Sequence, residues 1–219
     1  EGITSNPNNG DIYVGTFNVP NPAFNPAPVN AILRYSKRGK LLARTDFSGV
    51  TPLVGLTFNT KDNYIYVASL GDISGVGSKI LRIAADFSDG DQAEVVANMP
   101  FIGTPQDRTV VNLDNSTDTI SFNTNIRVPN DIIFNEKGDL FISDSFQAAV
   151  FRMNDPSTCE APCAMEVVAH DALLATAGFP SFGANGIAFN HDESELFIAN
   201  TGDDRILKLD MSGSGQISV

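Results

Sequence analysis

Oxygen-bearing side chains open three of four repeated segments in this chain. Asn130 begins the run Asn-Asp-Ile-Ile-Phe, Asn185 begins Asn-Gly-Ile-Ala-Phe and Glu1 begins Glu-Gly-Ile, whereas the corresponding position of the remaining segment is Val54. Carboxylate and amide oxygens are the ligands that hard cations such as Ca²⁺ prefer. Asparagine before a strand is also common turn chemistry, because it tolerates positive φ and bonds its own backbone. These residues are therefore candidate metal ligands with a structural alternative.

The elements that must position these residues are short strands. Each repeated segment continues through a polar turn into a second apolar run with a central aromatic residue, and then into a third run that ends on Arg or Lys. The aromatic residues Tyr13, Tyr66, Phe141 and Phe197 lie 53, 75 and 56 residues apart. Short β-branched and aromatic runs between turn residues are typical of strands. No apolar period of 3.6 residues persists, so the helix content should be low, with at most a short helix within 165–176.

Units of about fifty residues with three or four antiparallel strands predict an all-β propeller. We expect a single domain over residues 1–219, with blades at about 1–50, 51–125, 126–180 and 181–219. The long second interval indicates an insertion in the second blade, which we place within residues 100–125. Because nothing in the last segment resembles a closing strand, we expect about four blades of a six-bladed ring rather than a closed ring of four. A partner chain could complete such a ring.

Two stretches of the chain resemble a known family. Residues 128–145 are Val-Pro-Asn-Asp-Ile-Ile-Phe-Asn-Glu-Lys-Gly-Asp-Leu-Phe-Ile-Ser-Asp-Ser, and residues 183–201 are Gly-Ala-Asn-Gly-Ile-Ala-Phe-Asn-His-Asp-Glu-Ser-Glu-Leu-Phe-Ile-Ala-Asn-Thr. They resemble the senescence marker protein/gluconolactonase family, whose relatives include luciferin-regenerating enzyme, the paraoxonases and the strictosidine synthases. The resemblance implies a six-bladed propeller with a divalent metal, commonly calcium, in its central channel.

The resemblance also implies which residues hold that metal. Glu1, Asn130 and Asn185 match three of the ligand positions, and a fourth ligand, an Asp one blade later, would lie beyond Val219. Asp131 matches a ligand of a second, deeper metal in the paraoxonases. It could equally be a buried turn carboxylate that accepts hydrogen bonds from backbone amides.

The catalytic residues are not assigned by the sequence. Val54 stands near the position where paraoxonases carry a histidine, and the only histidines, His170 and His191, are expected to be surface or structural residues. The chain has no Gly-x-Ser-x-Gly elbow, which argues against a serine hydrolase. Two functions stay open: a Ca²⁺-dependent (or other divalent cation-dependent) lactonase or esterase-like hydrolase, and a non-catalytic propeller that binds a ligand or protein partner around a structural metal.

Composition limits the partners and the compartment. A formal net charge of −12 makes nucleic acid a poor partner, because its binding relies on many Lys and Arg contacts to phosphate. The apolar runs are far too short to span a membrane. Cys159 and Cys163, the only cysteines, predict a disulfide-closed loop and an oxidising compartment. With the glycosylation sequon at Asn115, they favour a secreted, extracellular or periplasmic protein.

Overall fold

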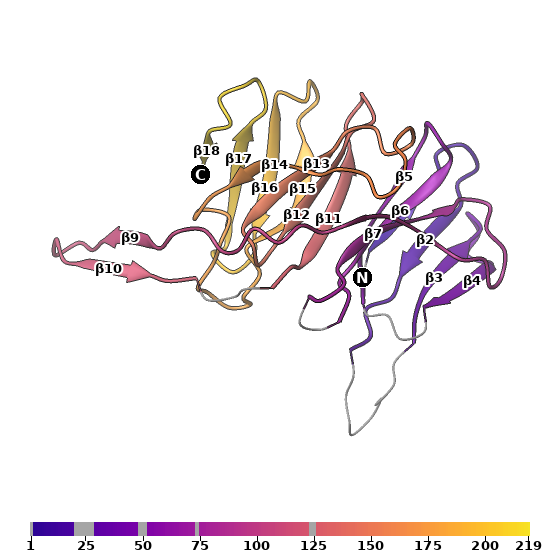
Figure 1. Cartoon of the computed structure of the whole chain (residues 1–219), viewed down its shortest axis with the longest axis horizontal. Helices are drawn as coiled ribbons and strands as arrows, with labels where there is room; N and C mark the ends of the chain where they lie inside the picture. Colours follow the sequence, from indigo (N-terminus) through magenta and orange to yellow (C-terminus); the bar gives the residue numbers. More distant parts are fainter. Residues whose placement is uncertain (1, 20–28, 48–51, 73–74, 123–125) are drawn as a thin grey trace.

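The described part of the chain is built from strands alone. A computed structural model describes residues 2–19, 29–47, 52–72, 75–122 and 126–219 (Figure 1). Within these ranges every regular element is a strand, which confirms the all-β prediction. The segment 165–176 contains a strand followed by a turn instead of a helix. Because no helix occurs among the described residues, none of them forms a helix that could cross a membrane.

Sixteen of the strands form four antiparallel sheets of four strands each, and each sheet follows the chain order. The first sheet contains β1 (Ile3–Ser5), β2 (Ile12–Gly15), β3 (Asn30–Tyr35) and β4 (Leu41–Phe47). The second contains β5 (Leu53–Asn59), β6 (Tyr64–Ser69), β7 (Lys79–Ala84) and β8 (Glu94–Asn98). The third contains β11 (Pro129–Phe134), β12 (Leu140–Asp144), β13 (Ala149–Met153) and β14 (Glu166–His170). The fourth contains β15 (Ala184–Phe189), β16 (Glu195–Asn200), β17 (Arg205–Asp210) and β18 (Ile217–Ser218).

The sheets pack face to face through three apolar cores, one between each pair of neighbours (Figure 1). The first strands of the sheets contact one another in the order β1, β5, β11, β15. Alternate residues of β6 and of β12 point to opposite neighbouring sheets, as the two-residue period of a strand requires. Tyr66 faces the third sheet, where its ring meets Phe134 edge-on at 5.1 Å, and Phe141 meets Phe189 of the fourth sheet in the same way. Radially stacked four-stranded meanders of this kind are the architecture of propeller blades.

The predicted insertion lies between the second and third sheets and contains a separate hairpin. Its strands are β9 (Arg108–Val111) and β10 (Thr117–Ile120), which project beyond the fourth sheet (Figure 1). Arg108 anchors its base through an ion pair at 3.1 Å with Asp203, in the turn between β16 and β17 of the fourth sheet. The side chains of Val111 and Leu113 near its tip are exposed.

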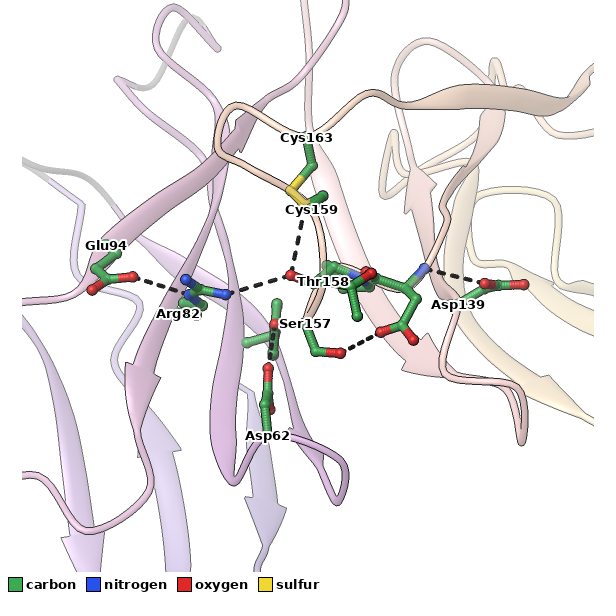
Figure 2. The surroundings of a disulfide bond; sticks show 11 residues. Asp62, Arg82, Glu94, Asp139, Ser157, Thr158, Cys159 and Cys163 are labelled. Carbon is green, nitrogen blue, oxygen red and sulfur yellow. Dashed lines mark hydrogen bonds and ion pairs between the residues drawn. A yellow bond between two sulfur atoms is a disulfide. The ribbon is translucent and has the colours of Figure 1, made fainter.

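The two cysteines form a disulfide at the outer edge of the third sheet, as the sequence predicted (Figure 2). The disulfide loop and the residues just before it contact the second sheet: Cys163 N donates to the carbonyl of Val96 at 2.8 Å, and Arg82 donates to the carbonyl of Pro156 at 3.4 Å. Figure 2 shows Arg82 between this loop and Glu94, with which it forms an ion pair at 3.0 Å. The loop therefore fastens the third sheet to the second far from the first strands.

Candidate functional site

Asn130 and Asn185 occupy the same structural position in neighbouring sheets. Each lies near the start of a first strand, where the strand pairing slips between Pro129 and Ile132 and between Ala184 and Ile187. A bulge of this kind re-aims the side chains of the extra residues. Both side chains, together with Val54 of the second sheet, line the same two cavities. Asp131 borders the second of these cavities as well, so the structure brings together three of the four predicted ligand residues, and Glu1 lies outside the described residues.

A hydroxyl group just after the adjoining second strand accepts a hydrogen bond from each amide. Asn130 Nδ2 donates to Ser145 Oγ at 2.9 Å, and Ser145 Oγ donates its own proton to the carbonyl of Ala184 at 2.7 Å. Because that proton is committed, the Ser145 oxygen can only accept from Asn130, and so the amide NH₂ must face it. Asn185 Nδ2 likewise donates to Thr201 Oγ1, at 2.8 Å. Nδ2 of each residue thus faces the hydroxyl, and the carbonyl oxygen takes the other position of the amide group.

Asp131 occupies a position where the other three repeats have glycine. Gly55 has no room for a side chain, since a Cβ there would lie 2.6 Å from the carbonyl oxygen of Asn130. The Asp131 side chain instead crosses to the fourth sheet, where Oδ2 accepts from the backbone N–H of Ile187 at 2.9 Å. Oδ1 accepts from the N–H of Ile132 at 2.9 Å. Burial raises the pKa of Asp131, and these two backbone hydrogen bonds partly oppose the shift.

This bonding pattern bears on the two roles that the sequence left open for Asp131. Each carboxylate oxygen already accepts a backbone N–H, which is the pattern expected for a buried turn carboxylate. Ser143 reinforces the same junction, because its hydroxyl donates to the carbonyl of Asn185 at 2.6 Å. Asp131 and Ser143 therefore connect the first strands of the third and fourth sheets through polar groups.

The cavity at the start of the first strands has a volume of about 230 Å³ and mostly apolar walls. Asn130 and Asn185 are its polar residues; the other lining residues are Phe17, Val19, Val54, Leu70, Ile126, Val128, Phe146 and Phe182. A second cavity of about 210 Å³ follows the first strands further and includes Asp131, Gly55 and Gly186. The two asparagines and Val54 border both cavities, so they lie where a ligand in the first cavity would meet the second.

The donor set gives a partial fit to a divalent cation. Two amide oxygens are suitable ligands for Ca²⁺ but carry no charge. Among the residues that the structure describes, no group of three or more His, Cys, Asp and Glu side chains is arranged to hold a metal ion. The negative charge of a cation site here would come from Glu1, or from Asp131 at the expense of its backbone hydrogen bonds.

Other residues with catalytic potential lie elsewhere. His170 ends β14 and His191 lies in the turn before β16, and both are exposed. Neither borders the two cavities.

Sequence reasoning missed the hydroxyl partners Ser145 and Thr201. They follow their asparagines by 15 and 16 residues, at the end of the next strand, and Leu70 holds the same place relative to Val54. The pairing of Asn with a hydroxyl residue, and of Val with Leu, is visible in the sequence once the repeats are aligned.

Fold and site together define a propeller-type all-β protein with a small-molecule-sized pocket where its first strands converge. Neither a protein-family profile nor a curated protein matches the sequence. Solved structures do match in fold. The hydrazine synthase of Kuenenia stuttgartiensis aligns with a TM-score of 0.60 at 11% identity, over 96% of this chain and 58% of that one.

Two further structures are similar to the chain. The periplasmic gluconolactonase PpgL of Pseudomonas aeruginosa aligns with a TM-score of 0.53 at 17% identity, over 94% of this chain and 52% of that one. A protein of unknown function from Bacteroides caccae aligns with a TM-score of 0.53 at 15% identity, over 97% of this chain and 64% of that one. The chain therefore spans about half to two thirds of the length of these three proteins. At such identities the likeness establishes the fold and leaves the chemistry to the site.

Proposed function

We propose that the protein is a lactonase or esterase-like hydrolase that binds its substrate in the cavity bordered by Asn130 and Asn185. The single observation that carries the proposal is the pair of oriented amides at the polar end of an otherwise apolar pocket. Pockets with apolar walls and a few convergent polar groups are typical of small-molecule sites. The fold similarity to a gluconolactonase agrees with this proposal.

A divalent cation, which we propose to be Ca²⁺, would be held by the carbonyl oxygens of Asn130 and Asn185 with Glu1. Such an ion supplies Lewis-acid polarisation of an ester carbonyl. Ser145 and Thr201 would orient the two amides from behind, as outer partners of metal ligands commonly do. Asp131 would hold the two first strands at a fixed spacing through its hydrogen bonds to Ile132 and Ile187.

The alternative is a non-catalytic propeller that binds a ligand or protein partner in the same pocket. One observation favours it: no titratable side chain lines the apolar cavity, so no described residue is placed there as a general base. In that case any metal would be purely structural.

We further propose that the sheets belong to a six-bladed ring in an extracytoplasmic protein, completed by further blades or by a partner chain. Phe197 supports the first part: it corresponds to Tyr13, Tyr66 and Phe141, which are at most 2% exposed, yet it is 37% exposed. The disulfide supports the second part, because disulfides persist in oxidising compartments. Asn115 lies at the tip of the exposed β9–β10 hairpin, where a glycan could be accommodated.

The test is hydrolysis of a panel of lactones and esters before and after chelation, with Ca²⁺ added back. Metal-dependent turnover that recovers on Ca²⁺ addition is the expected result. Ser145→Ala should weaken Ca²⁺ binding by about 10–100-fold, the usual cost of losing a group that orients a metal ligand. Ser5→Ala, at an exposed position, serves as the control. A chelator-sensitive melting temperature without turnover would favour the non-catalytic alternative, and turnover indifferent to chelation would contradict the metal.

A further inference from the structure

The pocket has a polar half and an apolar half, and the division follows the sheets. In the third sheet Asn130 pairs with Ser145, and in the fourth Asn185 pairs with Thr201. In the second sheet the corresponding pair is Val54 and Leu70, both less than a tenth exposed. The same repeat position therefore carries an amide and a hydroxyl on one side of the pocket and two aliphatic side chains on the other.

Aromatic side chains extend the apolar half. Phe17 of the first sheet stands in the position that corresponds to Leu70, and it lines the same cavity. Phe146 and Phe182 line the same cavity with their ring centroids 5.5 Å apart and their planes tilted by 35°. Together with Ile126, they pack against the buried cluster of Val54, Leu70 and Val128. The apolar wall is thus continuous from the second sheet to the loop before the fourth.

This wall discriminates between two kinds of ligand. A sugar lactone carries several hydroxyl groups, and each hydroxyl that enters an apolar site without a partner loses its hydrogen bonds to water. Asn130 and Asn185 are the polar residues of the cavity, so only hydroxyls next to these two amides would find a partner there. An alkyl or aryl group would instead remove apolar surface from water along the whole wall.

We infer that the ligand is an uncharged lactone or ester with an alkyl or aryl body, rather than a polyhydroxylated sugar lactone. Its polar head lies at Asn130 and Asn185, and its body lies against Val54, Leu70 and the phenylalanines of the cavity wall. The inference rests on the proposed function for the words lactone and ester. The preference for an apolar body rests on the cavity walls alone.

A series of γ-lactones with alkyl tails of increasing length tests the inference, with glucono-δ-lactone as the polar comparison. Binding is measured by isothermal titration calorimetry and, separately, hydrolysis is measured by pH-stat. We expect the affinity to rise roughly fourfold for each methylene that enters the pocket, from the transfer free energy of a buried CH₂. Glucono-δ-lactone should bind more weakly than any tailed member of the series.

The decisive variant is Val54→Asn with Leu70→Ser, which gives the second sheet the same pair as the third. It should flatten the dependence of affinity on tail length. Val111→Asn with Leu113→Ser makes the same two changes at exposed positions of the β9–β10 hairpin and should leave that dependence unchanged. Phe182→Ala, at a half-buried position of the cavity wall, should weaken binding of the longer tails and gives a second test if the double variant does not fold.

The outcomes separate the inference from the proposed function. Binding that strengthens with tail length without any hydrolysis supports the apolar ligand and overturns the hydrolase. Hydrolysis that favours glucono-δ-lactone and ignores tail length supports the hydrolase and overturns the inference. Tail-length dependence that persists in the Val54/Leu70 variant also overturns it, because the apolar body would then lie elsewhere.

Discussion

Asp131 differs from its counterparts in the other repeats both in residue type and in contacts. The repeats have glycine at this position in the other three sheets, and Gly55 leaves no space between its strand and the next. Asp131 replaces that backbone contact with a carboxylate that reaches Ile187. The third and fourth sheets therefore meet through hydrogen bonds at the level where Asn130 and Asn185 border the cavities. Because Asp131 stands where the other repeats have glycine, its carboxylate helps to shape the polar half of the site.

The raised pKa of Asp131 predicts a pH dependence of stability. Burial raises the pKa above the ordinary value of 3.8 that the unfolded chain would show. The folded protein then holds the Asp131 proton to a higher pH than the unfolded chain does. The contribution of this residue to the free energy of unfolding therefore decreases as the pH rises from about 3.8 through the pKa of the folded protein. Asp131→Asn removes that contribution. Urea unfolding between pH 3.5 and 7 should show the stability of the wild type falling relative to that of the variant as the pH rises.

The control for this measurement is Asp204→Asn, at an exposed turn position with positive φ that asparagine tolerates. Its stability relative to the wild type measures the effect of removing one carboxylate at an exposed position. Asp131→Asn also places an amide NH₂ opposite a backbone N–H, which lowers stability by an amount that does not depend on pH. Parallel curves for the wild type and Asp131→Asn would therefore contradict the assignment.

Among the elements, β12 and the residue after it form several of the hydrogen bonds around the site. Ser143 and Ser145, at and just after its end, donate to carbonyls of β15, while Asp144 between them lies fully buried. Asp144 Oδ1 accepts the N–H groups of Val128, Phe146 and Gln147, and burial raises its pKa. The end of β12 therefore positions both the asparagine and the aromatic wall of the cavity.

We expect Ser145→Ala to lower the free energy of unfolding by about 1–3 kcal/mol, the cost of leaving buried hydrogen-bonding groups without a partner. The change removes the acceptor of the Asn130 amide and the donor to the Ala184 carbonyl. Urea denaturation compared with Ser5→Ala, which changes an exposed serine, measures the effect. Equal stabilities of the two variants would mean that water replaces the Ser145 hydroxyl at no cost.

The sequence predicted the strands better than the contacts between them. The recurring aromatic residues identified the second strand of every sheet, because β-branched and aromatic runs between turns have few other structures available. The hairpin β9–β10 was expected only as an insertion, since its strands are mostly exposed and lack a buried face with a two-residue pattern. The partners of Asp131 could not be predicted, because they depend on how closely two sheets approach.

The candidate site was likewise predicted only in part from the sequence. Asn130 and Asn185 were found from their equivalent places in the repeats, and the structure brings them to one pocket. The pocket's apolar wall escaped prediction because Phe17, Phe146 and Phe182 lie outside the repeated runs, in connections whose course the repeat does not specify. Val54 was noted as a missing ligand, and the structure adds that it belongs to that wall.

On the scale of the whole molecule, the four sheets present two very different kinds of face. Between sheets the aromatic positions of the second strands are sealed: Phe141 is 2% exposed and lies against Phe189. On the free face of the fourth sheet, Phe197 and Ile206 are 37% and 58% exposed. A blade of a closed ring has a neighbour on both faces, and in the proposed six-bladed ring the next blade would cover both residues.

The two phenylalanines at equivalent positions give a direct test of that ring. In the 219-residue chain, Phe141→Ala should lower the free energy of unfolding by about 3–5 kcal/mol, as truncation of a buried phenylalanine does, and Phe197→Ala should cost clearly less because its ring is partly solvated. The same pair of variants in a longer protein that contains this chain should cost nearly equal amounts if a further blade covers Phe197. The comparison is made by denaturant unfolding of both variants against the wild type, in the 219-residue chain and in the longer protein. A Phe197→Ala cost that stays small in the longer protein would mean that this face stays open, and the six-bladed ring would then be wrong.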